Sequence, residues 1–377
     1  MKFTVSSSAM RGAIAVANKA INSKSVLPIL GNIKLDFTEH EDGTRMTITG
    51  SDSETVLSVV IPVSETADLH SICLPTRTCL DMLSQLPEQP VVFSIDRGSL
   101  EVTVDYLNGR FTFMAYAPDE YPIFKELDAE AVCTTLPETL LTGVCTRLYP
   151  FAGNDKLRPV MNGIYFDFRG SSLFTVASDG HKLLKKEYKE LAHPTTGAFI
   201  LPASVAAILK TCLKGGDISV AFDAQNIRFQ GEAFTLTCRQ IEGRYPNYNS
   251  VIPSNPPYCL TVGRKELIAA ILRMLVMSSK ASGIIRFMMQ PMDDSLHVSA
   301  ENIDFSTSAT ESVSATHTAV KKVEIGFNGE FLKLLLETAT SDSIDLRFTD
   351  PATAALLYEH EDDTDYVMLL MPMMLNN

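Results

Sequence analysis

Apolar and polar residues follow two rhythms along this chain, and both predict regular secondary structure. Segments such as Leu100–Val104 and Phe234–Cys238 alternate with a period of two, which is typical of strands with one buried face. Other segments repeat apolar residues every three or four positions and predict helices over residues 7–24, 76–86, 137–149, 203–214, 263–280 and 328–339. The pattern favours an α+β fold, in which helices pack on antiparallel sheets.

Four short markers recur along the chain in the same order. One strand that leads into a helix ends at Val5, Leu136 and Val262, which are 131 and 126 residues apart. A second ends at Pro75, Pro202 and Asn328, which are 127 and 126 residues apart. An acidic turn follows a strand near residues 52, 179 and 301, and a Tyr-Pro pair occurs at residues 121–122 and 245–246. This periodicity predicts three similar domains with two helices each, at residues 1–127, 128–253 and 254–377.

The composition limits the class of protein. With 45% hydrophobic and 20% charged residues, the chain can bury sizeable cores and is not intrinsically disordered. Apolar runs such as Val367–Leu375 are shorter than the roughly 18–20 residues of a membrane span, and Met1–Val5 lacks the apolar stretch of a signal peptide. Seven cysteines without a Cys-x-x-Cys pair are typical of reduced thiols. We therefore expect a cytoplasmic protein.

Charge is distributed unevenly between the predicted helices and the rest of the chain. The net charge is −13, but the helical segments contain 12 Lys or Arg against 5 Asp or Glu, so that they carry +7 and the remainder −20. One interpretation is a helix-lined surface that contacts the phosphates of a nucleic acid without reading its bases. The other is that Lys and Arg are good helix formers on solvated faces. The basic residues that could face a nucleic acid include Arg11, Lys19, Lys24, Arg77, Arg147, Lys210, Lys214, Arg264, Lys265 and Arg273.

Catalysis and metal binding have little support in the sequence. No glycine-rich nucleotide-binding loop and no Gly-x-Ser-x-Gly motif occurs, so we expect no cofactor. Ser178 and His181 have the residue types of a hydrolase, but they lie in one turn, where neighbours rarely reach a relay geometry. The acidic run Glu359–Asp365 would hold a hard cation or form a solvated turn between strands. We expect neither catalytic residues nor a bound metal.

The C-terminal segment Tyr366–Leu375 is unusually apolar. Its part Val367–Leu370 fits a core strand, but Pro372 cannot donate to a strand ladder. The methionines that follow suit a surface that accepts varied apolar side chains. A core strand and a binding groove both remain open at this point.

Several motifs spread along the chain resemble those of one family. Together with the repeat, they are similar to the bacterial sliding clamps, the beta subunits of DNA polymerase III, over essentially all 377 residues. The motifs are Leu27–Asn32, Asn162-Gly163, Ser178–Leu183, Glu242–Tyr248, Glu324–Asn328 and Met371–Met373.

This resemblance implies a fold and a function. It implies a head-to-tail homodimer of clamp-type subunits, closed into a ring whose helices line a channel for double-stranded DNA. It implies a processivity factor rather than an enzyme, which keeps the replicative polymerase on DNA independently of sequence. The implied partners are the DNA polymerase III alpha subunit, the clamp loader delta subunit and other proteins with a clamp-binding motif.

In this family, partners dock a short peptide with Leu and Phe anchors into a pocket between the second and third domains. The resemblance places that pocket at Met161, Ser178, Gly180, His181, Lys182, Leu183, Pro246, Ser250, Val251, Leu369, Met371, Pro372, Met373, Met374 and Leu375. Ser250 and Met374 stand where relatives often have Arg, so the resemblance implies a less basic pocket here.

The resemblance also places contacts with DNA and with the second subunit. A loop near DNA in the family matches residues 153–158, where Asn154, Lys156 and Arg158 would face phosphates and Asp155 would weaken the attraction. Lys24 stands where relatives have a DNA-contacting Arg. Segments Arg110–Tyr116 and Leu275–Ser279 are candidates for the subunit interface.

Two other interpretations remain. The chain could be a clamp-fold binding hub that no longer serves replication, such as a duplicated copy. It could also be a hydrolase that uses Ser178 and His181.

Overall fold

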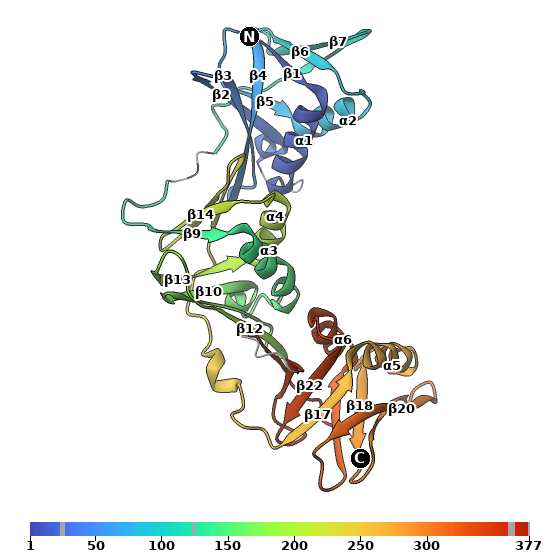
Figure 1. Cartoon of the computed structure of the whole chain (residues 1–377). Helices are drawn as coiled ribbons and strands as arrows, with labels where there is room; N and C mark the ends of the chain where they lie inside the picture. Colours follow the sequence, from blue (N-terminus) through green and yellow to red (C-terminus); the bar gives the residue numbers. More distant parts are fainter. Residues whose placement is uncertain (23–26, 123, 125, 361–365, 376–377) are drawn as a thin grey trace. The chain divides into compact units, whose positions relative to one another are not determined.

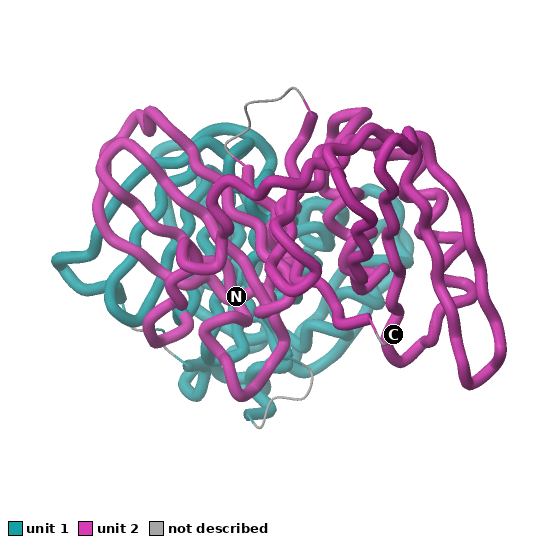
Figure 2. Tube along the Cα trace, turned by 90° about the horizontal axis from the view of Figure 1, so that it is seen from below, with its two compact units in different colours: residues 1–145, 204–240 teal, residues 146–203, 241–377 magenta. Residues whose placement is uncertain are grey.

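The computed structural model describes residues 1–22, 27–122, 124, 126–360 and 366–375. These residues form two compact units (Figure 2). Unit 1 contains residues 1–145 and 204–240, and unit 2 contains residues 146–203 and 241–377. None of the helices in the described ranges is long and apolar enough to cross a membrane.

Unit 1 is built on one antiparallel sheet, in which the strands follow the order β8-β7-β6-β1-β4-β16-β15-β14-β9 and β2, β3 and β5 branch off beside β4 (Figure 1). The strands are β1 (Lys2–Ser6), β2 (Asn32–His40), β3 (Gly43–Ser51), β4 (Thr55–Ala67), β5 (Ile72–Pro75), β6 (Pro90–Ile95), β7 (Glu101–Tyr106), β8 (Gly109–Met114), β9 (Val132–Pro137), β14 (Asp217–Phe222), β15 (Asn226–Gln230) and β16 (Phe234–Arg239). Its helices are α1 (Ser7–Ala17), α2 (Thr76–Ser84) and nearly all of α3 (Glu138–Arg147) and α4 (Ala203–Cys212).

Unit 2 is built on a second antiparallel sheet with the order β13-β10-β11-β12-β24-β23-β22-β17-β20-β19-β18-β21. The strands are β10 (Gly163–Gly170), β11 (Ser172–Ser178), β12 (Lys182–Tyr188), β13 (Thr195–Pro202), β17 (Tyr258–Gly263), β18 (Ile284–Met289), β19 (Ser295–Asn302), β20 (Thr307–His317), β21 (Val323–Asn328), β22 (Ser343–Phe348), β23 (Ala355–Glu359) and β24 (Tyr366–Leu370). Helices α5 (Arg264–Met277) and α6 (Gly329–Thr338) lie side by side.

The predicted α+β fold class is confirmed, since the described residues contain six α-helices and two antiparallel sheets. Each sheet joins strands of two predicted repeats: β16 pairs with β4 in unit 1, and β12 pairs with β24 in unit 2. The predicted middle domain therefore contributes strands to both units. The boundaries at residues 127/128 and 253/254 stay predictions.

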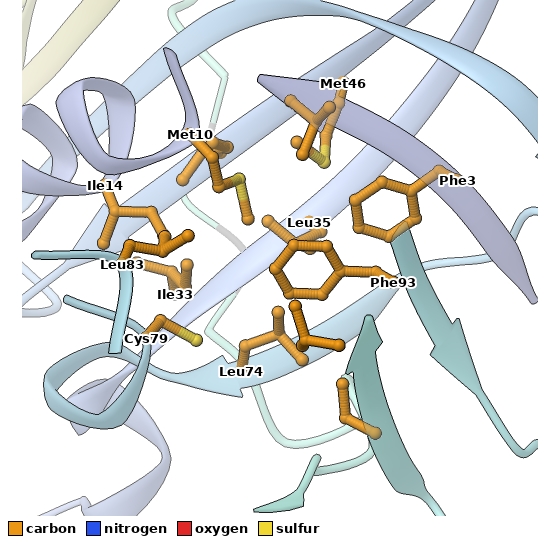
Figure 3. Close-up of a cluster of buried hydrophobic side chains, with 14 of the residues drawn as sticks. Phe3, Met10, Ile14, Ile33, Leu35, Met46, Leu74, Cys79, Leu83 and Phe93 are labelled. Atoms are coloured by element: carbon orange, nitrogen blue, oxygen red, sulfur yellow. The ribbon is translucent and has the colours of Figure 1, made fainter. Parts of the chain in front are cut away.

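The spacing of apolar residues in α1 shows how the sequence builds a hydrophobic core. The side-chain oxygen of Ser6 caps the helix by accepting a hydrogen bond from Ala9 N at 3.1 Å. The buried positions Met10, Ala13, Ile14 and Ala17 follow helical spacing. Their side chains meet Cys79 and Leu83 of α2 and a strand layer in which the rings of Phe3 and Phe93 stack 5.0 Å apart (Figure 3).

Gly50 determines how closely α1 approaches the sheet. A Cβ atom at this position of β3 would lie 2.2 Å from the carbonyl oxygen of Ala17, so any side chain forces the backbone to move. We expect Gly50→Ala to lower the free energy of unfolding by about 3 kcal/mol, measured by urea titration. Gly12→Ala in α1 is the matched control: it meets no atom within 4 Å, and we expect it to raise the free energy by about 0.5–1 kcal/mol. Equal effects at both positions would contradict this account.

Candidate functional site

A largely apolar cavity of about 110 Å³ opens in unit 2. It is lined by the predicted residues Met161, Ser178, Gly180, Lys182, Leu183, Pro246, Val251, Leu369 and Met371, and also by Tyr245, Asn247 and Tyr248. Aliphatic, sulfur-containing and aromatic side chains thus surround a few polar groups. Such a lining can bury apolar side chains of a ligand and orient it by hydrogen bonds.

The turn between β11 and β12 forms one side of the cavity. The Ser178 hydroxyl donates to the carbonyl oxygen of Lys182 at 2.9 Å and accepts from the N–H of Gly180 at 3.1 Å. Asp179 Oδ1 accepts from the N–H groups of His181 and Lys182 at 2.8 and 2.9 Å. Gly180 has a φ of +93°, which a residue with a side chain rarely adopts. These bonds hold the turn in one conformation.

Lys182 forms an ion pair with Asp179 and lies over the ring of Phe331 in α6. Partial burial alone would raise the pKa of the Asp179 carboxyl, but the Lys182 ammonium and the two backbone N–H donors outweigh burial and hold the pKa below its ordinary value. The carboxylate and the ammonium therefore satisfy each other, and the cavity carries little free charge.

Aromatic residues outside the predicted pocket set complete the lining. The ring of Tyr245 stacks on Tyr165 of β10 at a centroid distance of 4.8 Å, and Tyr248 Oη accepts a hydrogen bond from Arg169 at 3.3 Å. Tyr245 and Tyr248 belong to the motif Glu242–Tyr248 that carried the resemblance. The motif therefore pointed to the right segment of the chain. Which of its side chains line the cavity is seen only in the structure, where Tyr245 and Tyr248 contact β10.

The C-terminal segment forms a core strand and also contributes to the cavity, the two alternatives that its sequence left open. Residues Tyr366–Leu370 form β24, a core strand, and Leu369 and Met371 also line the cavity. Beyond them the chain leaves the cavity: Met373 N donates to Gly326 O at 2.8 Å, and the Leu375 side chain packs on Gly326. The predicted pocket residues outside the cavity lining are His181, Ser250, Pro372, Met373, Met374 and Leu375.

Four of the predicted DNA-facing cations, Arg11, Lys19, Lys210 and Lys214, are exposed and have no ion pair among the described residues. Burial raises the pKa of the Cys212 thiol, and Thr211, Lys19 and Lys214 act in the opposite direction. Lys19, which follows α1, and Lys214, which follows α4, therefore act on the same thiol although they are far apart in sequence. In the same unit, the charge of Lys210 acts on Cys145, whose pKa burial raises to about 12.

Six of the other predicted cations have partners within the protein. Arg273 pairs with Glu311 through Nε at 2.7 Å, and Arg147 donates to the Tyr366 hydroxyl at 2.6 Å. Arg264 Nε donates to the carbonyl oxygen of Ser341 at 2.7 Å. Looser pairs join Arg77 to Asp81, Arg158 to Asp155, and Lys265 to Asp342. In the loop 153–158, Asn154 and Lys156 are exposed, and Lys24 lies outside the described residues.

In the part of the chain that is described, the arrangement of side chains supports neither a hydrolase site at Ser178 and His181 nor a metal site in the acidic run. The Ser178 hydroxyl is directed to a carbonyl oxygen, and the His181 ring stacks on Phe331 at 6.1 Å. Glu359 accepts from Thr340 and His360 contacts Asp345, while residues 361–365 of the acidic run lie outside the described residues. No group of three or more His, Cys, Asp or Glu among the described residues could hold a metal ion.

Comparison with known proteins supports one family. The chain matches three consecutive domains of the DNA polymerase III beta subunit: the N-terminal domain over residues 1–125, the central domain over 135–247 and the C-terminal domain over 249–374. Proteins named beta sliding clamp from Vibrio cholerae and Staphylococcus aureus are 25% identical over 377 residues and 24% identical over 363, covering 100% and 94% of both chains.

Solved structures agree on the fold. A DNA polymerase III beta subunit from Pseudomonas aeruginosa is 23% identical with a TM-score of 0.92, and a DNA polymerase sliding clamp from Bacillus subtilis is 22% identical with a TM-score of 0.89. Both comparisons cover 100% of each chain. With three family domains matched in order along the chain, the resemblance seen in its motifs is confirmed: the protein belongs to the family of DNA polymerase III beta subunits, the bacterial sliding clamps.

Proposed function

We propose that two copies of this chain close head to tail into a ring around double-stranded DNA and keep a replicative polymerase on its template. The observation that carries this proposal is the ordered match of all three beta-subunit domains. The role is that of a processivity factor without catalysis in the cytoplasm. Its action is topological, because a closed ring cannot leave a duplex that has no ends.

The cations without ion pairs support the proposal that the ring surrounds DNA. Arg11, Lys19, Lys210 and Lys214 lie on or beside helices α1 and α4 and are free of ion pairs within the described part of the chain. Contacts with phosphates need no base recognition, which suits a protein that moves along any sequence. Because the remainder of the chain is acidic, DNA is repelled from surfaces without such cations.

The apolar cavity supports docking of partner peptides in unit 2. Its lining can bury a Leu or Phe anchor, and burial of such side chains commonly dominates binding. We propose that the DNA polymerase III alpha subunit, the clamp loader delta subunit and other proteins with clamp-binding motifs use it. Ser250 and Met374 do not line the cavity, so we propose that they act on flanking residues of the peptide rather than on its anchors.

Two surfaces support the subunit interface. In unit 1, β8 is an edge strand of the described sheet, and Met114 at its end and Tyr116 just beyond it are exposed. In unit 2, exposed apolar side chains lie on α5 and in the turn between β19 and β20, two strands against which α5 packs, and we treat them as one patch: Leu272, Val276, Met277, Ile303 and Phe305. The hydroxyl of Thr307 donates to the carbonyl oxygen of Met277 at 3.1 Å and joins the two segments of this patch. Exposed apolar patches of this kind are typical of interaction surfaces.

Retention on closed DNA tests the proposal as a whole. We expect a solution mass near twice 41.4 kDa, and protein loaded on a nicked circular plasmid should co-elute with it in gel filtration. Linearising the plasmid should release the protein, because a ring slides off free ends. Equal retention on circular and linear DNA, or a monomer that never associates with circles, would refute the ring.

The unpaired lysines should set the salt dependence of DNA binding. We expect the combined substitution Lys19→Gln, Lys210→Gln and Lys214→Gln to flatten the slope of log affinity against log salt by about 0.9 for each phosphate that is no longer neutralised. Fluorescence anisotropy of a labelled linear duplex across a salt series measures the slope. Arg45→Gln is the control, since Arg45 on β3 is already paired with Asp42 at 2.7 Å and should leave the slope unchanged. If the triple variant has the same slope as the wild type, these three lysines do not contact DNA.

A further inference from the structure

Hydrogen bonds join the two ends of the loop 153–162, which lies between α3 and β10. Asp155 N donates to Asn162 Oδ1 at 2.9 Å, and Asn162 Nδ2 donates back to the carbonyl oxygen of Asp155 at 3.0 Å. Gly153 N donates to the carbonyl oxygen of Met161 at 2.7 Å. The tip of the loop, Lys156 and Leu157, is exposed. The loop therefore presents a cationic tip on a base of defined geometry.

Arg158 connects this loop to the cavity in two ways. Its carbonyl oxygen accepts a hydrogen bond from Met161 N at 3.0 Å. Its guanidinium lies directly against Gly180, because a Cβ atom at Gly180 would be 2.6 Å from Arg158 Nη1. Met161 and Gly180 both line the cavity, so one arginine supports two of its sides.

The position of the Arg158 guanidinium depends on an exchangeable partner. Its Nε is 3.0 Å from Asp155 Oδ2, and both side chains are substantially exposed to solvent. Exposed ion pairs of this kind contribute little free energy and exchange readily. A phosphate group offers oxygens that accept two parallel hydrogen bonds from a guanidinium, so it can compete with a single carboxylate oxygen.

The cavity must widen before it can take a docked peptide. Its volume of about 110 Å³ is below the roughly 300–1,000 Å³ of common ligand pockets. Gly180 and the flexible Met161 border it on the side where Arg158 packs. Withdrawal of the guanidinium from Gly180 would free space into which the flexible Met161 side chain can move, so that the cavity widens while the turn between β11 and β12 keeps its hydrogen bonds.

We infer that Arg158 couples DNA contact to peptide docking: a DNA phosphate draws its guanidinium from Asp155 and from Gly180, and the cavity opens to the anchor side chains of a partner. The inference rests on the proposed ring around DNA and on the proposed docking site. A ring on DNA then binds partners more tightly than a free ring. By linkage, a docked peptide raises the affinity for phosphate by the same factor.

Titration of a labelled Gln-Leu-x-Leu-Phe-type peptide tests this coupling, with the full-length protein alone and saturated with a short linear duplex. For the wild type we expect the duplex to tighten peptide binding by about fivefold. Asp155→Asn keeps the hydrogen-bond acceptor for Leu157 N but removes the charge that holds Arg158, so it should reach much of this affinity without DNA. Arg158→Gln should show the same peptide affinity with and without the duplex.

Lys156→Gln is the matched control, because Lys156 is exposed in the same loop and does not line the cavity. It should weaken duplex binding as Arg158→Gln does, yet keep the fivefold coupling once the duplex is saturating. An equal effect of the duplex on wild type and Arg158→Gln, or wild-type behaviour of Asp155→Asn, would overturn the role of Arg158 while leaving peptide docking intact. Absence of any saturable peptide binding to the wild type would instead overturn the proposed docking function, and this inference with it.

Discussion

Val251→Asp should abolish most of the binding of a partner peptide without disturbing the fold. Val251 lines the cavity, but 51% of its surface is exposed, so the new carboxylate stays hydrated in the free protein. A bound anchor side chain would strip water from that carboxylate without supplying a partner. We expect a loss of about 2 kcal/mol, or a factor of about 30 in Kd, in a fluorescence titration with the same type of peptide.

Val320→Asp supplies the matched control for this substitution. Val320 belongs to the same unit, is 84% exposed and does not line the cavity, so the same change of charge should leave peptide affinity unaltered. A similar loss in both variants would point to a general effect of charge. Unchanged binding by Val251→Asp would show that the peptide docks elsewhere.

Dissociation of the ring is the expected result of placing carboxylates at Ile303 and Phe305. Both side chains lie in the turn between β19 and β20 and are 81% and 78% exposed, so Ile303→Asp with Phe305→Asp should leave the folded subunit intact. In a closed ring the two carboxylates would be buried against apolar surface, where unpaired charge is strongly disfavoured. Sedimentation should report a mass near 41.4 kDa, and retention on circular DNA should disappear.

Met292→Asp is the control for the ring, because Met292 is fully exposed in the turn at the opposite end of β19. It should preserve both the doubled mass and the retention on circles. If the variant with both carboxylates remains dimeric, the patch around Val276 and Phe305 is not the interface. If Met292→Asp also dissociates, the dimer is sensitive to any added acidic charge.

Much of the fold could be predicted from the sequence because helix and strand periods depend on local backbone geometry. Leu267, Ala270, Ile271 and Met274 follow the helical period that predicted α5, and all are buried. The ends of elements were less predictable. The segment 7–24 was expected to be one helix, but α1 ends at Ala17 and a short 3-10 turn follows over Asn18–Ala20.

The candidate site was only partly accessible to sequence reasoning. Ser178, Gly180 and Leu183 lie in one motif, and that motif does line the cavity. Tyr245 was missed because its place depends on stacking with Tyr165, which is 80 residues away. Met373 was predicted from the resemblance to the family; its backbone pairs with Gly326, and it does not line the cavity.

By itself, the sequence determined the repeat, the secondary structure, the family and the basic character of the helices, since each is carried by residue type and by spacing along the chain. Only the tertiary structure decided which cations are free. Arg273 is neutralised by Glu311 from another element, whereas Lys19 and Lys214 have no ion pair among the described residues. The physical reason is that charge pairing and cavity walls depend on side chains that are close in space but distant in sequence, and local patterns do not record these distances.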